Sequence, residues 1–386
     1  MKKIAFVATG YIIKYDGISV YTENLLINFL SNIQEQNLSY KVDIYVGESA
    51  LELLKERVYQ ENLDVKINLI SVKDNSFASK ILHLNYKLIK NGTYDLIFMT
   101  NFMPTIFLFS KTVKVIHDFS VNNFSELYSK SYLKYHNTLL SYAKLFDHGI
   151  GYISNTTKSD LNKFHKINDI NKNLLHLQNG IPFKVKNYSR PEDSFVEEKY
   201  YSNKLNFLVV GRINKHKGFD RILDFFKYFD QSKEQEGFEK VTLNIVGKQT
   251  SETTQIFKDL KLKNIDLIFH GFLNDEELNN IYTSSHFCLF LSRNEGYGIP
   301  LVEAMWFKSI PIISNIPIFN EIMGEEYAKF DKQTGYKEAI SNFILKVFKN
   351  KEFREETRKH LEQIVKNESE GYNKASINLI NFIKGL

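Results

Sequence analysis

The stretch Glu295-Gly-Tyr-Gly-Ile-Pro-Leu-Val-Glu303-Ala-Met is the most informative part of the sequence. It follows the apolar run 286–292, which predicts a buried strand, and Pro300 suits the first turn of a helix that carries Glu303. A glycine loop at a helix N-terminus leaves backbone N–H groups unpaired, and these can hold an anion or a ring of hydroxyls. The two carboxylates are therefore placed to grip two parts of one polar ligand.

Apolar, β-branched runs alternate with helical patterns through both halves of the chain. The predicted strands are Lys3–Ala8, Lys41–Val46, Val65–Ser71, Leu96–Thr100, Val113–His117, Gly149–Ser154, Asn206–Val210, Thr242–Val246, Ile265–Phe269, Phe287–Leu291 and Ile310–Ile313. Strands separated by helices indicate parallel sheets covered on both faces, and two successive sets indicate two doubly wound α/β domains. Ligands of such sheets bind at the carboxyl ends of the strands.

A polar segment without periodicity divides the two sets of strands. Residues 184–204 contain one proline and read as the junction between a first domain over residues 1–190 and a second over residues 200–369. The C-terminal run 353–386 is helical and mostly polar. With 386 residues, the chain is long enough for two domains that each have a core.

Composition indicates a soluble or peripheral protein of a reducing compartment. The chain is 43% hydrophobic and 25% charged, which is typical of globular proteins. The single cysteine, Cys288, excludes a disulfide framework and reads as a small buried hydrophobe. The N-terminal run 1–8 is only one strand long, so it reads as a strand and not as a signal peptide. No apolar stretch approaches the roughly 20 residues that span a bilayer, and we expect a cytoplasmic location.

The net charge of +5 is concentrated in the first half of the chain. Residues 1–190 contain 23 Lys and Arg against 16 Asp and Glu, whereas residues 191–386 contain 27 against 29. A basic half favours an anionic partner, either a membrane surface or a phosphate-bearing acceptor, and no nucleic-acid motif accompanies it. The segments 79–90 and 132–144 are amphipathic, aromatic and basic. They could dock on an anionic inner leaflet or simply pack in the first domain.

A basic turn follows the strand predicted at Asn206–Val210. In the run 211–218, Gly-Arg-Ile-Asn-Lys-His-Lys-Gly, Arg212 offers a planar fork of donors and Lys217 a compact charge. Alone, this spacing could be a solvated turn, but the strand before it and the flanking glycines favour a diphosphate cradle. The sequence has no Asp-x-Asp and no His-rich or Cys-rich metal spacing, so we predict neither a metal nor another cofactor.

The pairing of Glu295-x7-Glu303 with Gly-Arg212-x4-Lys217-Gly resembles the signature of retaining glycosyltransferases of the GT-B fold, family 4 (glycosyl transferases group 1). The resemblance implies two Rossmann-like domains that face each other across a cleft, with the final helix, 370–386, returning to the first domain. It implies that Glu295 contacts the donor sugar, that Glu303 contacts the ribose of a UDP- or GDP-sugar, and that Arg212 and Lys217 stabilise the departing diphosphate.

The same resemblance extends to other loops that follow strands. It assigns donor binding to the loop residues Gly296, Tyr297 and Gly298 and backbone placement to Gly247. His270 reads equally well as a loop residue bonded to its neighbours or as a contact of the nucleobase.

Two features of the first half also match the family. The loop after the first strand carries Asp16-Gly17 where the family often has a Gly-Gly pair; Gly17 would let the backbone approach the donor, and Ser19 could cap the next helix. His117 ends a strand, and the resemblance makes it a catalytic residue that faces the donor sugar across the cleft, near the acceptor hydroxyl.

The sequence therefore predicts a retaining, metal-independent hexosyl- or N-acetylhexosaminyl-transferase. A high Lys, Asn and Ile content suggests a bacterial source, where such enzymes add sugars to glycans or lipid-linked glycans of capsule, O-antigen or lipooligosaccharide. Two alternatives remain open at this point: a catalytically silent GT-B partner subunit that binds nucleotide sugar or glycan, and a glycan phosphorylase, which would need a pyridoxal cofactor.

Overall fold

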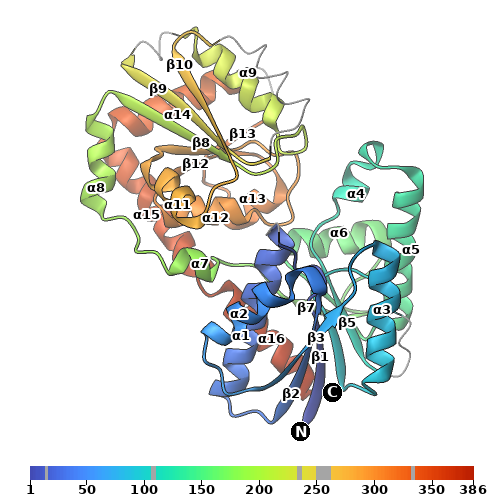
Figure 1. Ribbon diagram of the computed structural model, residues 1–386. Coiled ribbons are helices and arrows are strands. Elements are labelled where there is room, and N and C mark those ends of the chain that lie inside the picture. Colours follow the sequence, from blue (N-terminus) through green and yellow to red (C-terminus); the bar gives the residue numbers. More distant parts are fainter. Residues whose placement is uncertain (14–15, 106–109, 233–236, 249–261, 332–334) are drawn as a thin grey trace. The chain divides into compact units, whose positions relative to one another are not determined.

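The chain forms two compact units, each built on one parallel sheet. The computed structural model describes residues 1–13, 16–105, 110–232, 237–248, 262–331 and 335–386. Unit 1 comprises residues 1–182 and 370–386, and unit 2 comprises residues 183–369. Helices cover both faces of each sheet (Figure 1). The predicted class, two doubly wound α/β domains, is confirmed.

Unit 1 has a seven-stranded sheet in the order β3-β2-β1-β4-β5-β6-β7. Its strands are β1 (Lys2–Val7), β2 (Tyr40–Gly47), β3 (Lys66–Val72), β4 (Leu96–Met99), β5 (Thr112–Ile116), β6 (Gly149–Tyr152) and β7 (Asn173–His176). Its described helices are α1 (Gly17–Glu35), α2 (Leu51–Gln60), α3 (Phe77–Lys90), α4 (Ser120–Asn123), α5 (Lys130–Phe146), α6 (Asn155–His165) and α16 (Gly371–Lys384). The strand order reverses between β1 and β4, which is where doubly wound sheets bind ligands.

Unit 2 has a six-stranded sheet in the order β10-β9-β8-β11-β12-β13. Its strands are β8 (Lys204–Val210), β9 (Lys240–Val246), β10 (Ile265–Gly271), β11 (Phe287–Phe290), β12 (Ile310–Ser314) and β13 (Lys329–Phe330). Its described helices are α7 (Phe183–Lys186), α8 (Asp193–Glu198), α9 (Phe219–Phe229), α11 (Asp275–Ser284), α12 (Ile299–Trp306), α13 (Pro317–Met323), α14 (Tyr336–Lys349) and α15 (Lys351–Glu368). Here the order reverses between β8 and β11.

The first loop of unit 1 differs from the sequence prediction in its helix cap. Helix α1 begins at Gly17, and its N-cap is Asp16, whose carboxylate accepts hydrogen bonds from the backbone N–H and the hydroxyl of Ser19 at 3.0 and 3.1 Å. The Ser19 hydroxyl also accepts a bond from the N–H of Ile12 at 3.0 Å and so closes the loop on itself. A carboxylate is as good an N-cap as a hydroxyl and also suits the positive end of the helix dipole. Lys14 and Tyr15 of this loop lie outside the described residues.

The segment 184–204, interpreted from composition as a junction, packs on unit 2. The chain leaves unit 1 after Pro182, and the buried side chains of Val196 and Tyr200 anchor the segment. Glu197 accepts hydrogen bonds from Arg354 and Arg358 of α15. The charged side chain of Glu197 in this segment is therefore used for ion pairs with α15, and the segment is not a solvated linker.

The last helix, α16, belongs to unit 1 although it follows unit 2 in sequence. Asn32 of α1 donates to Asn373 at 2.8 Å and to Ser376 at 3.2 Å. Tyr372 donates to the side chain of Asn179 at 3.1 Å. Within the ranges that the structure describes, no helix has the length and apolar character needed to cross a membrane.

Candidate functional site

The predicted donor residues gather at the carboxyl edge of the unit 2 sheet. The loop 211–218 follows β8 and the loop 291–298 follows β11, and these two adjacent strands flank the point where the strand order reverses. Because all strands of the sheet are parallel, both loops leave from the same edge. The topology thus brings together two motifs that are about eighty residues apart in the chain.

Glycines let the loop after β8 pass close to the end of β11. Gly218 has φ +69°, and a Cβ added to it would lie 1.7 Å from the carbonyl oxygen of Leu291. Gly247, after β9, has φ +150°, and a Cβ there would lie 2.0 Å from the carbonyl oxygen of Gly211. Both positions require glycine for conformation and for space. They set the spacing between the loops that carry the charged side chains.

Lys217 and Glu295 form an ion pair between these two loops. The ammonium of Lys217 donates to both carboxylate oxygens of Glu295, at 2.7 and 2.6 Å, and Ser292 donates to one of them at 2.8 Å. The Glu295 side chain is 13% exposed and that of Lys217 is 37% exposed. The family resemblance assigns Lys217 to the phosphates and Glu295 to the sugar. The direct contact between the two side chains was not predicted from the sequence.

The guanidinium of Arg212, in the same loop, is not committed to a carboxylate partner among the described residues. Its side chain is exposed, and it makes no hydrogen bond or ion pair with any of the residues that the structure describes. The neighbouring Ile213 is buried and anchors the backbone beneath it. A guanidinium held at a fixed backbone position without a carboxylate partner can still bind an incoming anion bidentately.

A second ion pair, which the sequence did not reveal, ties the same loops together. Arg293 donates to both carboxylate oxygens of Asp220 at 2.7 and 2.6 Å and also to the carbonyl oxygen of Lys215. Its backbone N–H donates to the carbonyl oxygen of His216 at 2.9 Å. This bidentate pair holds the β8–α9 loop against the β11–α12 loop. Each partner reads as an ordinary surface charge in the sequence, so no local signal marks the contact.

Glu303 lies in a buried polar cluster on α12. Only 5% of the residue is exposed, and the hydroxyl of Tyr282 donates to one carboxylate oxygen at 3.1 Å. Burial raises the pKa of the Glu303 carboxyl, against the lowering effect of the nearby Lys184 ammonium, which itself binds Asp275 at 3.1 Å. No hydrogen bond to the second carboxylate oxygen is found among the described residues. That oxygen is available to a ligand hydroxyl.

The glycine loop between the two glutamates is fixed from within unit 2. Tyr297 is buried, and its hydroxyl donates to Glu368, so a donor contact of Tyr297 would have to come from its backbone. Gly298 has φ +105° and is the N-cap of α12, where Pro300 occupies the first turn as predicted. Gly298 therefore stands at the start of α12, the end of a helix whose first N–H groups favour an anion or hydroxyls.

His270 at the end of β10 interacts with its neighbour in the sheet. Its Nε2 lies 2.9 Å from the side-chain oxygen of Asn244, and burial lowers the pKa of its imidazole. The N–H of Gly247 donates to the carbonyl oxygen of Gly271 at 2.8 Å, which joins the loops after β9 and β10. The structure shows the contact of His270 with a neighbour, and its contact with a nucleobase stays a prediction.

His117 of unit 1 follows β5, next to the strand-order reversal of that sheet. Its Nε2 lies 2.7 Å from the carbonyl oxygen of Thr100, so Nε2 carries the proton and Nδ1 is left as the acceptor. Burial lowers the pKa of the imidazole, and the ring meets Tyr21 edge-on at 4.8 Å between centroids. A neutral ring in this tautomer can accept a hydrogen bond from a sugar hydroxyl.

Among the described residues, nothing requires a glycine at position 17 for space, because a Cβ there would meet none of their atoms within 4 Å. The predicted approach of a ligand to its backbone is therefore compatible with open space. By contrast, a Cβ on Gly10 would lie 2.9 Å from the side chain of Ile18.

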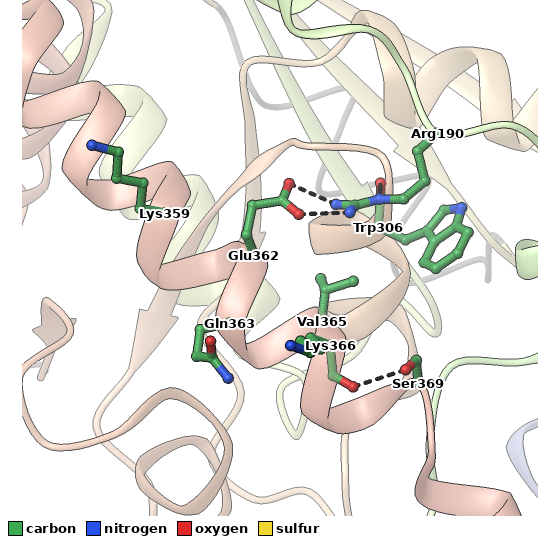
Figure 2. Close-up of a pocket in the computed structure, with 8 residues that line it drawn as sticks. All are labelled: Arg190, Trp306, Lys359, Glu362, Gln363, Val365, Lys366 and Ser369. Atoms are coloured by element: carbon green, nitrogen blue, oxygen red, sulfur yellow. Dashed lines mark hydrogen bonds and ion pairs between the residues drawn. The ribbon is translucent and has the colours of Figure 1, made fainter.

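A groove of about 560 Å³ lies elsewhere on unit 2, along α15. Figure 2 shows Arg190 spanning it, with both ends of its guanidinium on Glu362 at 2.6 and 2.7 Å. The guanidinium carbon also lies 5.2 Å from the ring centroid of Trp306. Because the guanidinium of Arg190 is already paired with Glu362, we assign no ligand to this groove. Among the described residues, no cluster of three or more metal-ligating side chains occurs.

Comparison with known proteins finds a family match for the part of the chain that contains the candidate site. Residues 190–366 match the family model described as glycosyl transferases group 1. An uncharacterized 41.2 kDa protein from the cps region of Klebsiella pneumoniae is 30% identical over 119 residues, 31% of this chain and 30% of that protein. The O-antigen chain mannosyltransferase RfbU of Salmonella typhimurium is 29% identical over 156 residues, 39% of this chain and 41% of that enzyme. The matches thus span less than half the length of these relatives.

The fold is that of a solved GT-B structure over the whole chain. The crystal structure of Anabaena HepE in complex with UDP and glucose matches with a TM-score of 0.68 and 16% identity, covering 100% of both chains. At this identity the likeness establishes the fold, and the predicted GT-B class is confirmed.

Proposed function

We propose that this chain, which belongs to the glycosyl transferases group 1 family by its residues 190–366, transfers a sugar from a UDP- or GDP-sugar to a glycan or lipid-linked glycan. The observation that carries the proposal is the Lys217–Glu295 ion pair beside the unpaired Arg212, at the strand-order reversal of unit 2. An anion-binding arginine and a lysine–glutamate pair at one sheet edge suit a ligand with a diphosphate next to a polyhydroxyl group.

Each charged group has a separate task in the proposed reaction. Arg212 binds the diphosphate in a bidentate manner, and Lys217 shares its charge between the β-phosphate and Glu295. Glu295, held by Ser292 and Lys217, presents its remaining lone pairs to the donor sugar. The available oxygen of Glu303 accepts a hydrogen bond from the ribose. Two cations beside the leaving group stabilise the charge that develops on it, the task a metal ion performs in other transferases.

We propose that the reaction retains the anomeric configuration, as the resemblance to retaining family-4 enzymes implies. The acceptor hydroxyl attacks the anomeric carbon on the face from which the diphosphate departs. The bond between that carbon and the diphosphate oxygen breaks, the new glycosidic bond forms, and the acceptor proton passes to the leaving oxygen. No protein nucleophile is needed. The neutral His117 of unit 1 offers Nδ1 to a sugar hydroxyl.

The acceptor class is inferred from the relatives. One relative is named as an O-antigen chain mannosyltransferase, and another comes from a cps region. Together with the basic first half of the chain, these names support a surface polysaccharide or its lipid-linked precursor as the acceptor.

Donor binding and turnover by the full-length chain test the proposal. A panel of UDP- and GDP-sugars is screened by thermal shift and by release of the nucleoside diphosphate. Arg212→Ala and Glu303→Gln are then compared with Lys204→Ala, a control whose exposed side chain lies at the start of β8, at the opposite end of the strand from the loop 211–218. We expect donor affinity to fall about tenfold or more in the first two variants, because each loses a charge-assisted bond, and to be unchanged in the control.

Wild-type donor affinity in both site variants would rule the proposed site out. Binding without any turnover would instead indicate a silent partner subunit. Turnover should persist in EDTA, because the charges on the leaving group are met by side chains. The anomeric configuration of the product, read by NMR, decides retention.

A further inference from the structure

One face of helix α3 is apolar and exposed to solvent. Leu82, Tyr86 and Ile89 are 68%, 56% and 64% exposed, and they recur at the three- and four-residue spacing of a single helix face. The side chains that α3 buries against unit 1 are Leu84, Asn85 and Leu88, on its opposite face. Packing within unit 1 therefore accounts for one side of this helix only.

Helix α5 extends the same surface. Phe77 at the start of α3, 56% exposed, meets Tyr135 of α5 edge-on, with ring centroids 6.1 Å apart. Tyr132 packs against Tyr135 at 6.5 Å, and both are exposed. Figure 1 shows α3 and α5 side by side on one face of the unit 1 sheet. We call the exposed residues of these two helices the α3–α5 face.

The charges on the α3–α5 face have a single sign. Neither helix contains an aspartate or a glutamate. Together they contain the lysines Lys80, Lys87, Lys90, Lys130, Lys134 and Lys144. Exposed leucine and isoleucine flanked by tyrosines and lysines, without acidic groups, are the features of helices that lie in a bilayer interface.

We propose that the α3–α5 face docks on an anionic lipid bilayer. Its apolar side chains would enter the headgroup boundary, its tyrosines would lie at that level, and its lysines would pair with lipid phosphates. A second copy of the chain fits this face poorly, because a symmetric contact would oppose lysines to lysines. The inference is independent of the proposed sugar transfer, since binding to lipid needs neither a donor nor turnover.

Vesicle flotation with the full-length chain tests this inference. The probes are phosphatidylcholine vesicles with and without phosphatidylglycerol. We expect binding to the anionic vesicles alone, weakened by added salt because screening reduces the attraction of the lysines. Leu82→Ser with Ile89→Ser removes the apolar stripe, and Lys87→Glu with Lys90→Glu reverses the charge. Each pair should reduce binding about tenfold or more.

Matched controls lie on other parts of unit 1. Ile170→Ser changes a side chain that is 95% exposed but outside the face, and Lys66→Glu reverses an exposed charge on β3. Both should bind vesicles as the wild type does. These side chains are exposed, apart from Lys87, which is half-buried, so circular dichroism and the melting temperature should stay close to those of the wild type. Equal binding by face variants and controls, binding to neutral vesicles, or a face variant that alters only the oligomeric state in sedimentation would overturn the proposal.

Discussion

At the scale of single residues, Tyr282 holds the Glu303 carboxylate in the position that the proposed ribose contact requires. Tyr282→Phe removes the hydroxyl that donates to the buried carboxylate at 3.1 Å and leaves the ring stacked on Phe307. We expect donor affinity to fall by about 1 kcal/mol, roughly fivefold, because one hydrogen bond to a charged group is lost. Isothermal titration with the nucleoside diphosphate measures the change.

The matched control is another buried tyrosine of unit 2, Tyr327, whose hydroxyl donates to the carbonyl oxygen of Pro311 at 2.7 Å. Tyr327→Phe should lower stability without changing donor affinity.

The pH dependence of donor affinity adds a second readout. Burial raises the pKa of the Glu303 carboxyl. As the pH is lowered, wild-type donor affinity should therefore begin to fall at a higher pH than the one at which an ordinary glutamate titrates. Glu303→Gln should abolish this pH dependence. Equal affinity losses in the two Tyr→Phe variants would contradict the assigned role of Tyr282.

His286 makes unit 2 sensitive to acid. It is buried, its Nδ1 accepts from the N–H of Asn206 at 3.0 Å, and its Nε2 lies 3.0 Å from the carbonyl oxygen of Lys199. Burial lowers the pKa of the imidazole to about 4. Between the ordinary value of about 6.5 and 4, the unfolded chain binds a proton that the folded chain does not, so stability falls as the pH falls.

We expect the free energy of unfolding to drop by about 2 kcal/mol between pH 7 and pH 5 from His286 alone. Urea denaturation at the two pH values measures it. In His286→Gln this part of the pH dependence should vanish, although the overall stability is lower. A wild-type slope in His286→Gln would remove His286 as the cause.

Local patterns in the sequence singled out candidate residues of the site but not the contacts between them. Nearby glycines drew attention to Arg212, Lys217 and the two glutamates, and the site roles of these residues stay predictions. The contact of Lys217 with Glu295 joins residues 78 positions apart, and the Arg293–Asp220 pair joins residues 73 apart. Such pairs form only when the strands before the two loops become neighbours in the sheet. The local sequence around a charged residue does not indicate which strands will be neighbours.

At the scale of elements, two glycines at strand–helix junctions should respond oppositely to a methyl group. Gly218→Ala should destabilise unit 2 by about 2 kcal/mol or more, since the residue has a positive φ and the added Cβ would overlap the Leu291 carbonyl at 1.7 Å. Donor binding should fall with it, because Lys217 moves with this loop. Urea denaturation and donor titration give both quantities.

Gly17→Ala is the counterpart at the start of α1. Its added Cβ meets no atom within 4 Å, and alanine favours a helix, so stability should be unchanged or slightly higher. A loss of turnover with intact stability would then support close approach of the donor to this backbone. Wild-type turnover would leave Gly17 as a helix residue without a role in the site.

The sequence did not predict the edge strands β7 and β13, whose own residues form no strand pattern. Buried apolar runs identified the central strands. The edge strand β7 buries only Leu175, and β13 has two residues, so neither has a pattern of its own. Both form because a neighbouring strand offers unpaired backbone groups.

At the scale of the whole molecule, the two units are not two consecutive segments of the chain. Helix α16 follows unit 2 in sequence but belongs to unit 1. A Cβ on Gly371 at its start would lie 1.9 Å from the carbonyl oxygen of Asn179, so the helix enters unit 1 in close contact. Leu379, Ile380 and Ile383 are fully buried. Composition alone could not assign this helix, since its polar and apolar residues would suit either unit.

Ile380→Ala tests that assignment. A cavity in place of a fully buried isoleucine should cost about 2–5 kcal/mol, and the loss should fall on unit 1. Ile344→Ala in α14 is the matched control, also fully buried but in unit 2. Calorimetric melts with and without UDP distinguish the units, since a ligand raises the transition of the unit that binds it. Ile380→Ala should lower the transition that UDP leaves unchanged, and Ile344→Ala the one that UDP raises. The opposite pattern would place α16 with the donor-binding unit.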